Sequence, residues 1–421
     1  MVNIKLLDNG IRVVLEEIPY IRSVSFGIWM KNGSRNESIE NNGISHFIEH
    51  MLFKGTNNRS ARDIAEEMDS LGGQINAYTT KEYTCYHTRV LDKHIEKAMD
   101  ILSDMFLNSK FDDNDIARER KVIIEEINMY DDAPEEVVHD KLQESIWRGS
   151  SLGLPILGTV ETISNFDSDI LKDYFKNHYT NENTVISIAG NINQVESLKL
   201  IEKYFGHKEP VKTTDNEKYN TSYTPSFIKN KKDIEQIHMC MCFPALNRDN
   251  EHKYDLAVFN TIFGGSMSSI LFQKVREENA LTYSIYSYIS SYTDVGIFSV
   301  YAGMNPNQLE IVCQIIYDEM KNIKKNLISD RLINTTKEQI ISNYIIGTES
   351  TVNRMTSSGG SVLLRNSVQT QEEIIANMEK VTPKSVNDII NKILDFKNIS
   401  ISLSGNADSV DFAKIMPKNA E

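Results

Sequence analysis

The residues best suited to chemistry lie in one short stretch, His46-Phe-Ile-Glu49-His50. Residues four apart on a helix share one face, so both imidazoles can reach a single ion. Glu49 follows His46 by three residues and lies on that face too. Two neutral histidines beside a carboxylate base are typical of a hydrolytic zinc site, and H-x-x-E-H is the inverted form of the zinc-protease motif. On this motif alone, a solvated polar helix face stays open as the alternative.

A zinc site of this kind needs a third protein ligand, and a helical pattern at about 112–130 offers candidates. Glu119 and Glu126 are seven residues apart, which is two turns, so they share one face of that helix. Glu125 lies about 100° around the helix and faces elsewhere. Because helix carboxylates are mostly solvated, position alone does not separate a ligand from a surface residue.

The elements that must position these residues follow from hydrophobic periodicity. Period-two alternation predicts strands at 11–16, 23–29 and 184–190, and helical patterns occupy about 43–54, 60–71, 92–108 and 112–130. The stretch 207–226 is polar, contains proline and has no period, which is typical of a linker. After it the pattern restarts with alternating strands at 237–243 and 399–404.

The two halves look like copies of one domain. Three pairs of matching positions recur at a spacing of about 215 residues: Gly190-Asn191 with Gly405-Asn406, Ile95 with Leu309, and Tyr86 with Tyr301. A nearly constant offset indicates duplication of an α+β domain of about 210 residues. We therefore expect two homologous domains at 1–206 and 227–421, joined by the linker 207–226.

Composition limits the possible partners and compartment. The 421 residues are 40% hydrophobic and 25% charged, which is enough for a real core in each domain, and the net charge is −14. This charge disfavours nucleic acid and anionic membranes and favours basic partners. The four cysteines form no recognisable disulfide framework, no run of 18 apolar residues occurs, and the first residues lack the pattern of a secretory leader. We expect a cytoplasmic protein that does not bind membranes.

These motifs resemble the M16 zinc metallopeptidases, the group of pitrilysin, insulysin and the mitochondrial processing peptidase, and most closely the short bacterial members. Glu126 follows His50 by 76 residues, as the ligand glutamate of that family does, and Glu119 matches its supporting carboxylate. The segments 130–134 and 152–158 also look like family segments. The resemblance implies two homologous domains, each a mostly antiparallel sheet packed with helices.

The resemblance also implies roles for the residues of the motif. His46, His50 and Glu126 would hold one Zn²⁺ per chain, Glu49 would act as the general base, and Glu119 would hydrogen-bond a ligand histidine. The second copy would lack metal ligands: aligning Gly55 with Gly265 places other residue types opposite the motif, namely Leu256, Phe259 and Asn260.

Further residues are implied to contact the substrate. Asn76 and Ala77 match the sheet edge on which the family receives its substrate as an added strand. Arg276 and Tyr283 match a pair that polarises the scissile carbonyl and holds the oxyanion, in cis or in trans. Ala280 stands where the family often has glycine, which is a departure from the pattern.

Together these observations lead us to expect a zinc metalloendopeptidase that cleaves unfolded peptides or small proteins within a chamber. The alternative is a non-catalytic scaffold or partner subunit that binds peptides, because the family also contains such members. Two domains of this type make half of the chamber that larger members build from four. The resemblance therefore implies a homodimer, or a heterodimer with a chain that lacks the ligands.

Overall fold

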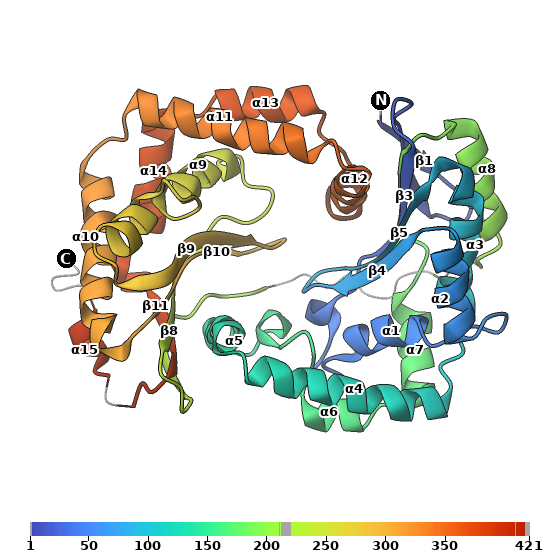
Figure 1. Ribbon diagram of the computed structural model, residues 1–421, viewed down its shortest axis with the longest axis horizontal. Helices are drawn as coiled ribbons and strands as arrows, with labels where there is room; N and C mark the ends of the chain where they lie inside the picture. The colour runs from blue at the N-terminus through green and yellow to red at the C-terminus, as the bar shows by residue number, and fades with distance from the viewer. Residues whose placement is uncertain (1, 210, 212–219, 409, 417–421) are drawn as a thin grey trace. The chain divides into compact units, whose positions relative to one another are not determined.

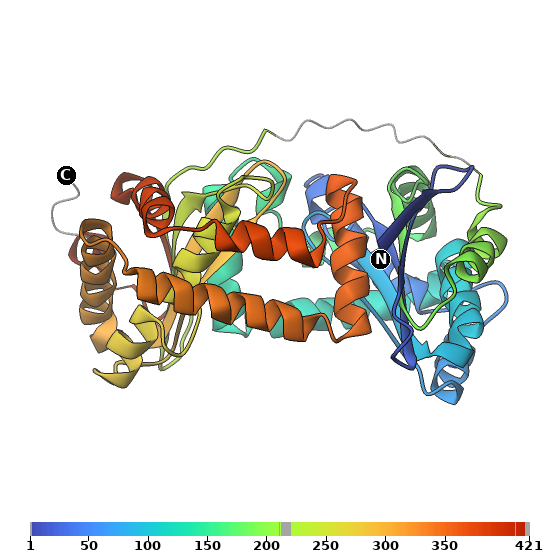
Figure 2. The same cartoon turned by 90° about the horizontal axis from the view of Figure 1, so that it is seen from above.

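Two β-sheets, each with its own helices, divide the chain into two units (Figures 1 and 2). The computed structural model describes residues 2–209, 211, 220–408 and 410–416. Unit 1 consists of Met1–Ile127, Leu154–Lys218 and Ile345–Val368. Unit 2 consists of Asn128–Gly153, Tyr219–Tyr344 and Gln369–Glu421.

The sheet of unit 1 has six strands, and the alternating apolar pattern of the sequence explains its central ones. Only the pair β2–β6 is parallel, and the other neighbours are antiparallel. Val24, Phe26 and Ile28 alternate along β3 and enter the core on one face of the sheet. In spatial order the strands are β1 (Val2–Leu6), β2 (Arg12–Glu17), β6 (Thr184–Gly190), β3 (Ser23–Met30), β5 (Thr84–Leu91) and β4 (Gln74–Thr79).

Helices cover both faces of this sheet. Those whose buried residues join the larger core of the unit are α1 (Ile44–Leu52), α2 (Ala61–Ser70), α3 (Ile95–Asn108), α4 (Asp113–Asp131), α6 (Val160–Ser164), α7 (Ser168–His178) and α8 (Gln194–Phe205). On the other face, α12 (Thr351–Arg365) packs against Trp29 and Cys85. The four helices predicted between residues 43 and 130 are thus confirmed as α1 to α4.

Unit 2 repeats the plan of unit 1 with five strands, in the order β7 (Phe227–Lys231), β11 (Ser400–Gly405), β8 (Ile237–Ala245), β10 (Gly296–Met304) and β9 (Thr282–Ser291). Only β7 and β11 are parallel, as β2 and β6 are in unit 1. Its helices are α5 (Pro134–Ile146), α9 (Lys253–Phe263), α10 (Leu309–Lys325), α11 (Asp330–Gly347), α13 (Gln371–Glu379), α14 (Pro383–Ile393) and α15 (Phe412–Ile415). The predicted α+β fold with two related, mostly antiparallel sheets is confirmed.

Two of the three repeat pairs occupy equivalent places. Gly190 and Gly405 end the matching strands β6 and β11 with positive φ angles of 148° and 128°. Ile95 and Leu309 begin α3 and α10, each directly after a short 3₁₀ turn. The third pair is wrong: Tyr86 joins the core under α3, whereas Tyr301 faces α5. Strand side chains alternate, so a match that is off by one residue places the partner on the opposite face.

Each unit includes a helix from the other half of the chain. The segment with α5 belongs to unit 2, where α5 packs on β8 and β11, and the segment with α12 belongs to unit 1. The units therefore differ from the contiguous stretches 1–206 and 227–421. The middle of the predicted linker 207–226 lies outside the described residues, so that boundary stays a prediction.

Across the part of the chain that the structure describes, no helix combines the length and the apolar character needed to cross a membrane.

Candidate metal centre

The position of α1 is fixed at its first turn by a buried carboxylate. Glu37 accepts hydrogen bonds from the backbone N–H groups of Gly43 at 2.8 Å and Ser45 at 2.9 Å, which would otherwise lack partners at a helix start. Burial raises the pKa of Glu37, and these hydrogen bonds oppose the rise. Gly43 has a φ of 92°, and a Cβ there would overlap Gly158, so this helix start requires glycine.

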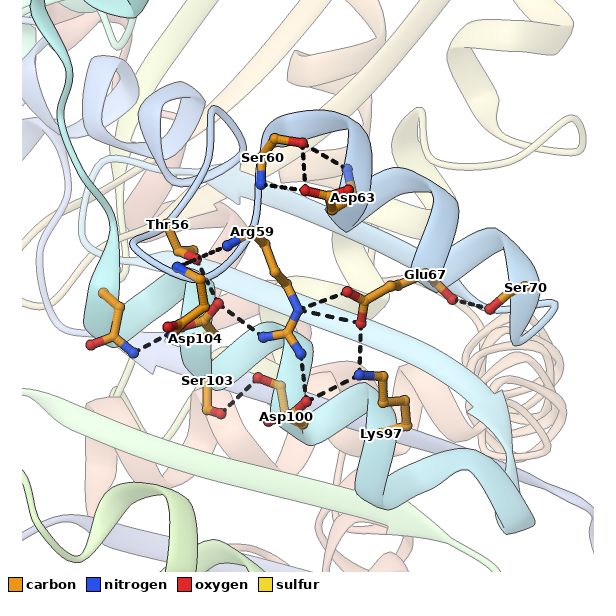
Figure 3. A network of polar contacts seen from close by, with 12 residues as sticks. Thr56, Arg59, Ser60, Asp63, Glu67, Ser70, Lys97, Asp100, Ser103 and Asp104 are labelled. Carbon is orange, nitrogen blue, oxygen red and sulfur yellow. Dashed lines mark hydrogen bonds and ion pairs between the residues drawn. The ribbon is translucent and has the colours of Figure 1, made fainter.

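The loop after α1 is anchored by Arg59 (Figure 3). Its guanidinium lies 3.1 Å from Glu67 on α2, and 2.5 Å from Asp100 and 2.9 Å from Asp104 on α3. Thr56, at the start of the same loop, donates a hydrogen bond to Asp104 at 2.6 Å. The segment that follows the H-x-x-E-H helix is therefore held against two neighbouring helices.

His46 and His50 on α1 meet Glu126 on α4, and their ligand atoms lie within 4.8 Å of one another. Glu126 Oε2 is 3.8 Å from His46 Nε2 and 3.5 Å from His50 Nε2. Ligands bound tetrahedrally at about 2.0–2.2 Å lie about 3.3–3.6 Å apart. The His50–Glu126 distance falls in this range and the His46–Glu126 distance lies slightly beyond it, so small side-chain shifts bring the two-nitrogen, one-oxygen donor set to the spacing of a zinc ion.

Both histidines are arranged to offer a lone pair. Burial, together with the neighbouring His50, lowers the pKa of His46 to about 3, so its ring is neutral at physiological pH. The Nδ1–H of His50 donates to Glu119 Oε1 at 2.9 Å, which leaves Nε2 free to face Glu126. Burial would raise the pKa of Glu119, but hydrogen bonds from His50 and Lys54 outweigh it and lower the pKa.

Glu49 lies beside this group and is oriented from the sheet. The hydroxyl of Thr79, at the end of β4, donates to Glu49 Oε2 at 2.6 Å, and Oε1 is left for another partner. Burial raises the pKa of Glu49, while the Thr79 hydrogen bond opposes that rise. The side chain is thus a half-buried carboxylate with one oxygen fixed, which suits a proton acceptor.

Asn76 and Ala77 lie on β4, the last strand of the sheet of unit 1. Asn76 is exposed and its side-chain oxygen accepts from the backbone N–H of Ala77 at 2.8 Å. An edge strand presents backbone groups that can pair with a further strand. Their contact with substrate stays a prediction.

Arg276 and Tyr283 belong to unit 2 and lie against each other. Arg276 lies in a π-helical turn (Phe272–Glu277), and its guanidinium stacks over the Tyr283 ring at 4.8 Å. Tyr283 is 80% exposed at the start of β9. Ala280 between them has a φ of 51°, which explains physically why glycine suits that position. The part of both residues in catalysis stays a prediction.

The second copy of the metal-site helix carries no ligands. In unit 2, α9 lies between β8 and β9 in sequence, as α1 lies between β3 and β4. At the positions aligned with the motif, Leu256 and Phe259 are buried in the core. Asn260 accepts a hydrogen bond from Ser287 at 2.8 Å. This helix is therefore used for packing.

Three residues of the site were missed from the sequence: Glu37, Lys54 and Thr79. Lys54 had a local signal, because it follows His50 by four residues and continues the same face of the helix. Thr79 ends the segment that resembles the family's substrate edge, but no spacing links it to Glu49, which lies 30 residues away on another element. Two partners of Glu37 are backbone groups of the first turn of α1, which no pattern of side chains reveals.

Comparisons with known proteins show which protein family the chain belongs to. Residues 12–160 match the family model described as Insulinase (Peptidase family M16), and residues 165–340 match the one described as Peptidase M16 inactive domain. The protein therefore belongs to peptidase family M16.

Its relatives agree with this assignment. An uncharacterized zinc protease of Bacillus subtilis, YmxG, is 44% identical over 96% of this chain and 98% of its own. One from Streptomyces coelicolor is 36% identical over 95% of this chain and 88% of its own. Among solved structures, a protease from Helicobacter pylori shares the fold at a TM-score of 0.90 and 18% identity, covering 96% of this chain and 99% of that one.

Proposed function

We propose that the protein is a zinc-dependent endopeptidase whose metal centre is the group His46, His50 and Glu126. The observation that carries the proposal is the convergence of these three side chains within 4.8 Å, with the carboxylate of Glu49 in the same helix. The zinc-protease names of its relatives support the metal and the class of reaction.

Zinc, when bound, would supply a Lewis acid that makes water acidic near neutral pH and polarises a carbonyl. The chain's own residues supply the rest. The Nε2 atoms of His46 and His50 and one oxygen of Glu126 would hold the ion. Glu49 accepts the proton of the attacking water at Oε1, the oxygen that Thr79 does not hold, and passes it to the leaving amine.

The substrates we propose are unfolded peptides or small proteins. The edge of β4 at Asn76 and Ala77 offers backbone pairing, a mode that recognises main chain more than side chains. The net charge of −14 would favour basic peptides.

Arg276 and Tyr283 would stabilise the oxyanion. The working form we propose is a cytoplasmic homodimer or heterodimer. Light scattering tests the assembly.

Replacing the base tests the chemistry. Glu49→Gln removes the proton acceptor but leaves all three ligands in place, so we expect stoichiometric zinc and loss of turnover by at least about 10²-fold. Zinc is measured by elemental analysis, and turnover with a quenched peptide with and without chelator. The matched control is Glu125→Gln, one residue before a ligand and exposed, which should cleave as the wild type does.

Two results would contradict the proposal. Turnover retained by metal-loaded Glu49→Gln protein would exclude Glu49 as the base. Wild-type protein that takes up no zinc and cleaves no peptide would favour the alternative, a scaffold or partner subunit that binds peptides.

A further inference from the structure

Lys54 lies next to the metal centre, although it follows the end of α1. The helix ends at Leu52, and the backbone N–H of Lys54 still donates to Met51 at 3.0 Å, so the turn continues through it. Gly55, with a φ of 120°, then turns the chain away. Lys54 therefore keeps the face of His50 and has a fixed starting point for its side chain.

The ammonium of Lys54 binds the carboxylate that holds His50. Its Nζ is 2.6 Å from Glu119 Oε2, while Glu119 Oε1 accepts from His50 Nδ1 at 2.9 Å. The Glu119 side chain is 5% exposed, so both of its oxygens depend on partners from the protein. One carboxylate thus bridges two residues of the same helix face, one oxygen to each.

This bridge determines how Glu119 can be oriented. A carboxylate with a single partner can rotate about its terminal torsion, which has a broad energy profile. A carboxylate held at both oxygens cannot rotate without breaking an ion pair. The ammonium therefore fixes Oε1 toward Nδ1, and Nδ1 in turn fixes the ring so that Nε2 faces His46 and Glu126.

We propose that Lys54 is a positioning residue of the metal centre, which orients His50 through Glu119. The inference rests on the proposed zinc site and deepens it. Among the described residues, the ion pair of Lys54 is with Glu119 and not with His46, His50 or Glu126, so its effect on the metal must pass through Glu119. If Lys54 acted only through its charge, removing it would strengthen zinc binding, because a nearby cation repels Zn²⁺. Positioning of His50 predicts the opposite change, a loss of zinc affinity.

The test is zinc affinity, measured by competition with a chromophoric chelator on folded protein and independently of peptide cleavage. Lys54→Met, which keeps an unbranched stem but removes the ammonium, should weaken zinc binding about tenfold, the lower end of the range for partners of metal ligands. Lys54→Arg restores a cation and should bind within about threefold of the wild type. Lys121→Met removes an exposed charge from α4 and should leave the affinity unchanged.

A double-mutant cycle tests the route of the effect. In protein that already carries Glu119→Gln, adding Lys54→Met should weaken zinc binding no further. Lys54→Met protein that binds zinc as tightly as the wild type, or a full loss that persists beside Glu119→Gln, would overturn the inference. Failure of the wild type to bind zinc would instead refute the proposed function.

Discussion

Ala280 has a backbone φ of 51°, in the left-handed region that costs a residue with a Cβ roughly 1–2 kcal/mol. Glycine removes that cost but loses more entropy on folding, by about 0.5–1 kcal/mol. We expect Ala280→Gly to stabilise unit 2 by about 0.5 kcal/mol, measured as a higher midpoint of urea unfolding. Asn366→Gly is the control, because asparagine tolerates its φ of 56° and should gain less. A lower midpoint for Ala280→Gly would contradict this account.

Individual site residues could be predicted where they repeat at helical spacing along the chain. His46, Glu49, His50, Glu119 and Glu126 repeat at helical spacings on two helices, and the structure brings the two histidines together with Glu119 and Glu126 of α4. Spacing could not reveal two of the residues that orient them, Thr79 and Glu37. The hydroxyl of Thr79 comes from a strand 30 residues away, and Glu37 accepts from backbone groups and the Asn42 amide in an irregular loop, so neither contact follows a helical spacing.

At the scale of elements, the position of the H-x-x-E-H helix depends on the loop that follows it. Arg59 joins that loop to three carboxylates, of which Asp104 is 5% exposed. Arg62, three residues on, makes an ion pair with Glu66 in which both side chains are exposed. The two arginines therefore have the same chemistry in different surroundings.

Replacing each arginine in turn compares the stability contributed by the buried network with that of the exposed ion pair. Arg59→Met leaves a buried carboxylate without its cation, so we expect a loss of about 3 kcal/mol in the free energy of unfolding. Arg62→Met should cost less than about 0.5 kcal/mol. Chemical denaturation followed by circular dichroism measures both, and equal losses would show that burial of the network contributes nothing.

At the scale of the whole molecule, the sequence predicted a duplicated domain. It did not predict that α5 packs in unit 2 and α12 in unit 1. The alternating strands and the matching starts of α3 and α10 follow from periodicity. Amphipathic patterns in α5 and α12 show that each helix buries a face, but they do not show against which sheet. That choice follows from packing between distant segments, such as Gly359 of α12 against Trp29 of β3.

The docking of α12 can be tested at two adjacent glycines. A Cβ at Gly359 would overlap the indole of Trp29, whereas a Cβ at Gly360 would lie 3.7 Å from the ring, in ordinary contact. We expect Gly359→Ala to destabilise unit 1 by about 1–3 kcal/mol and Gly360→Ala to stabilise it by up to about 1 kcal/mol. Thermal unfolding measures both, and a loss of the same size at both positions would contradict the close packing.

The helix α12 belongs to unit 1 but lies late in the sequence, which has a consequence for biosynthesis. The last strand of the first sheet ends at Gly190, but the helix that covers Trp29 and Cys85 is complete only at Arg365. At about 5–20 residues per second, a ribosome needs roughly 10–35 s to add the residues between them. During that interval one apolar face of the nascent sheet lacks its cover. We expect the growing chain to expose a binding surface for chaperones during synthesis, because transiently exposed apolar surface favours aggregation.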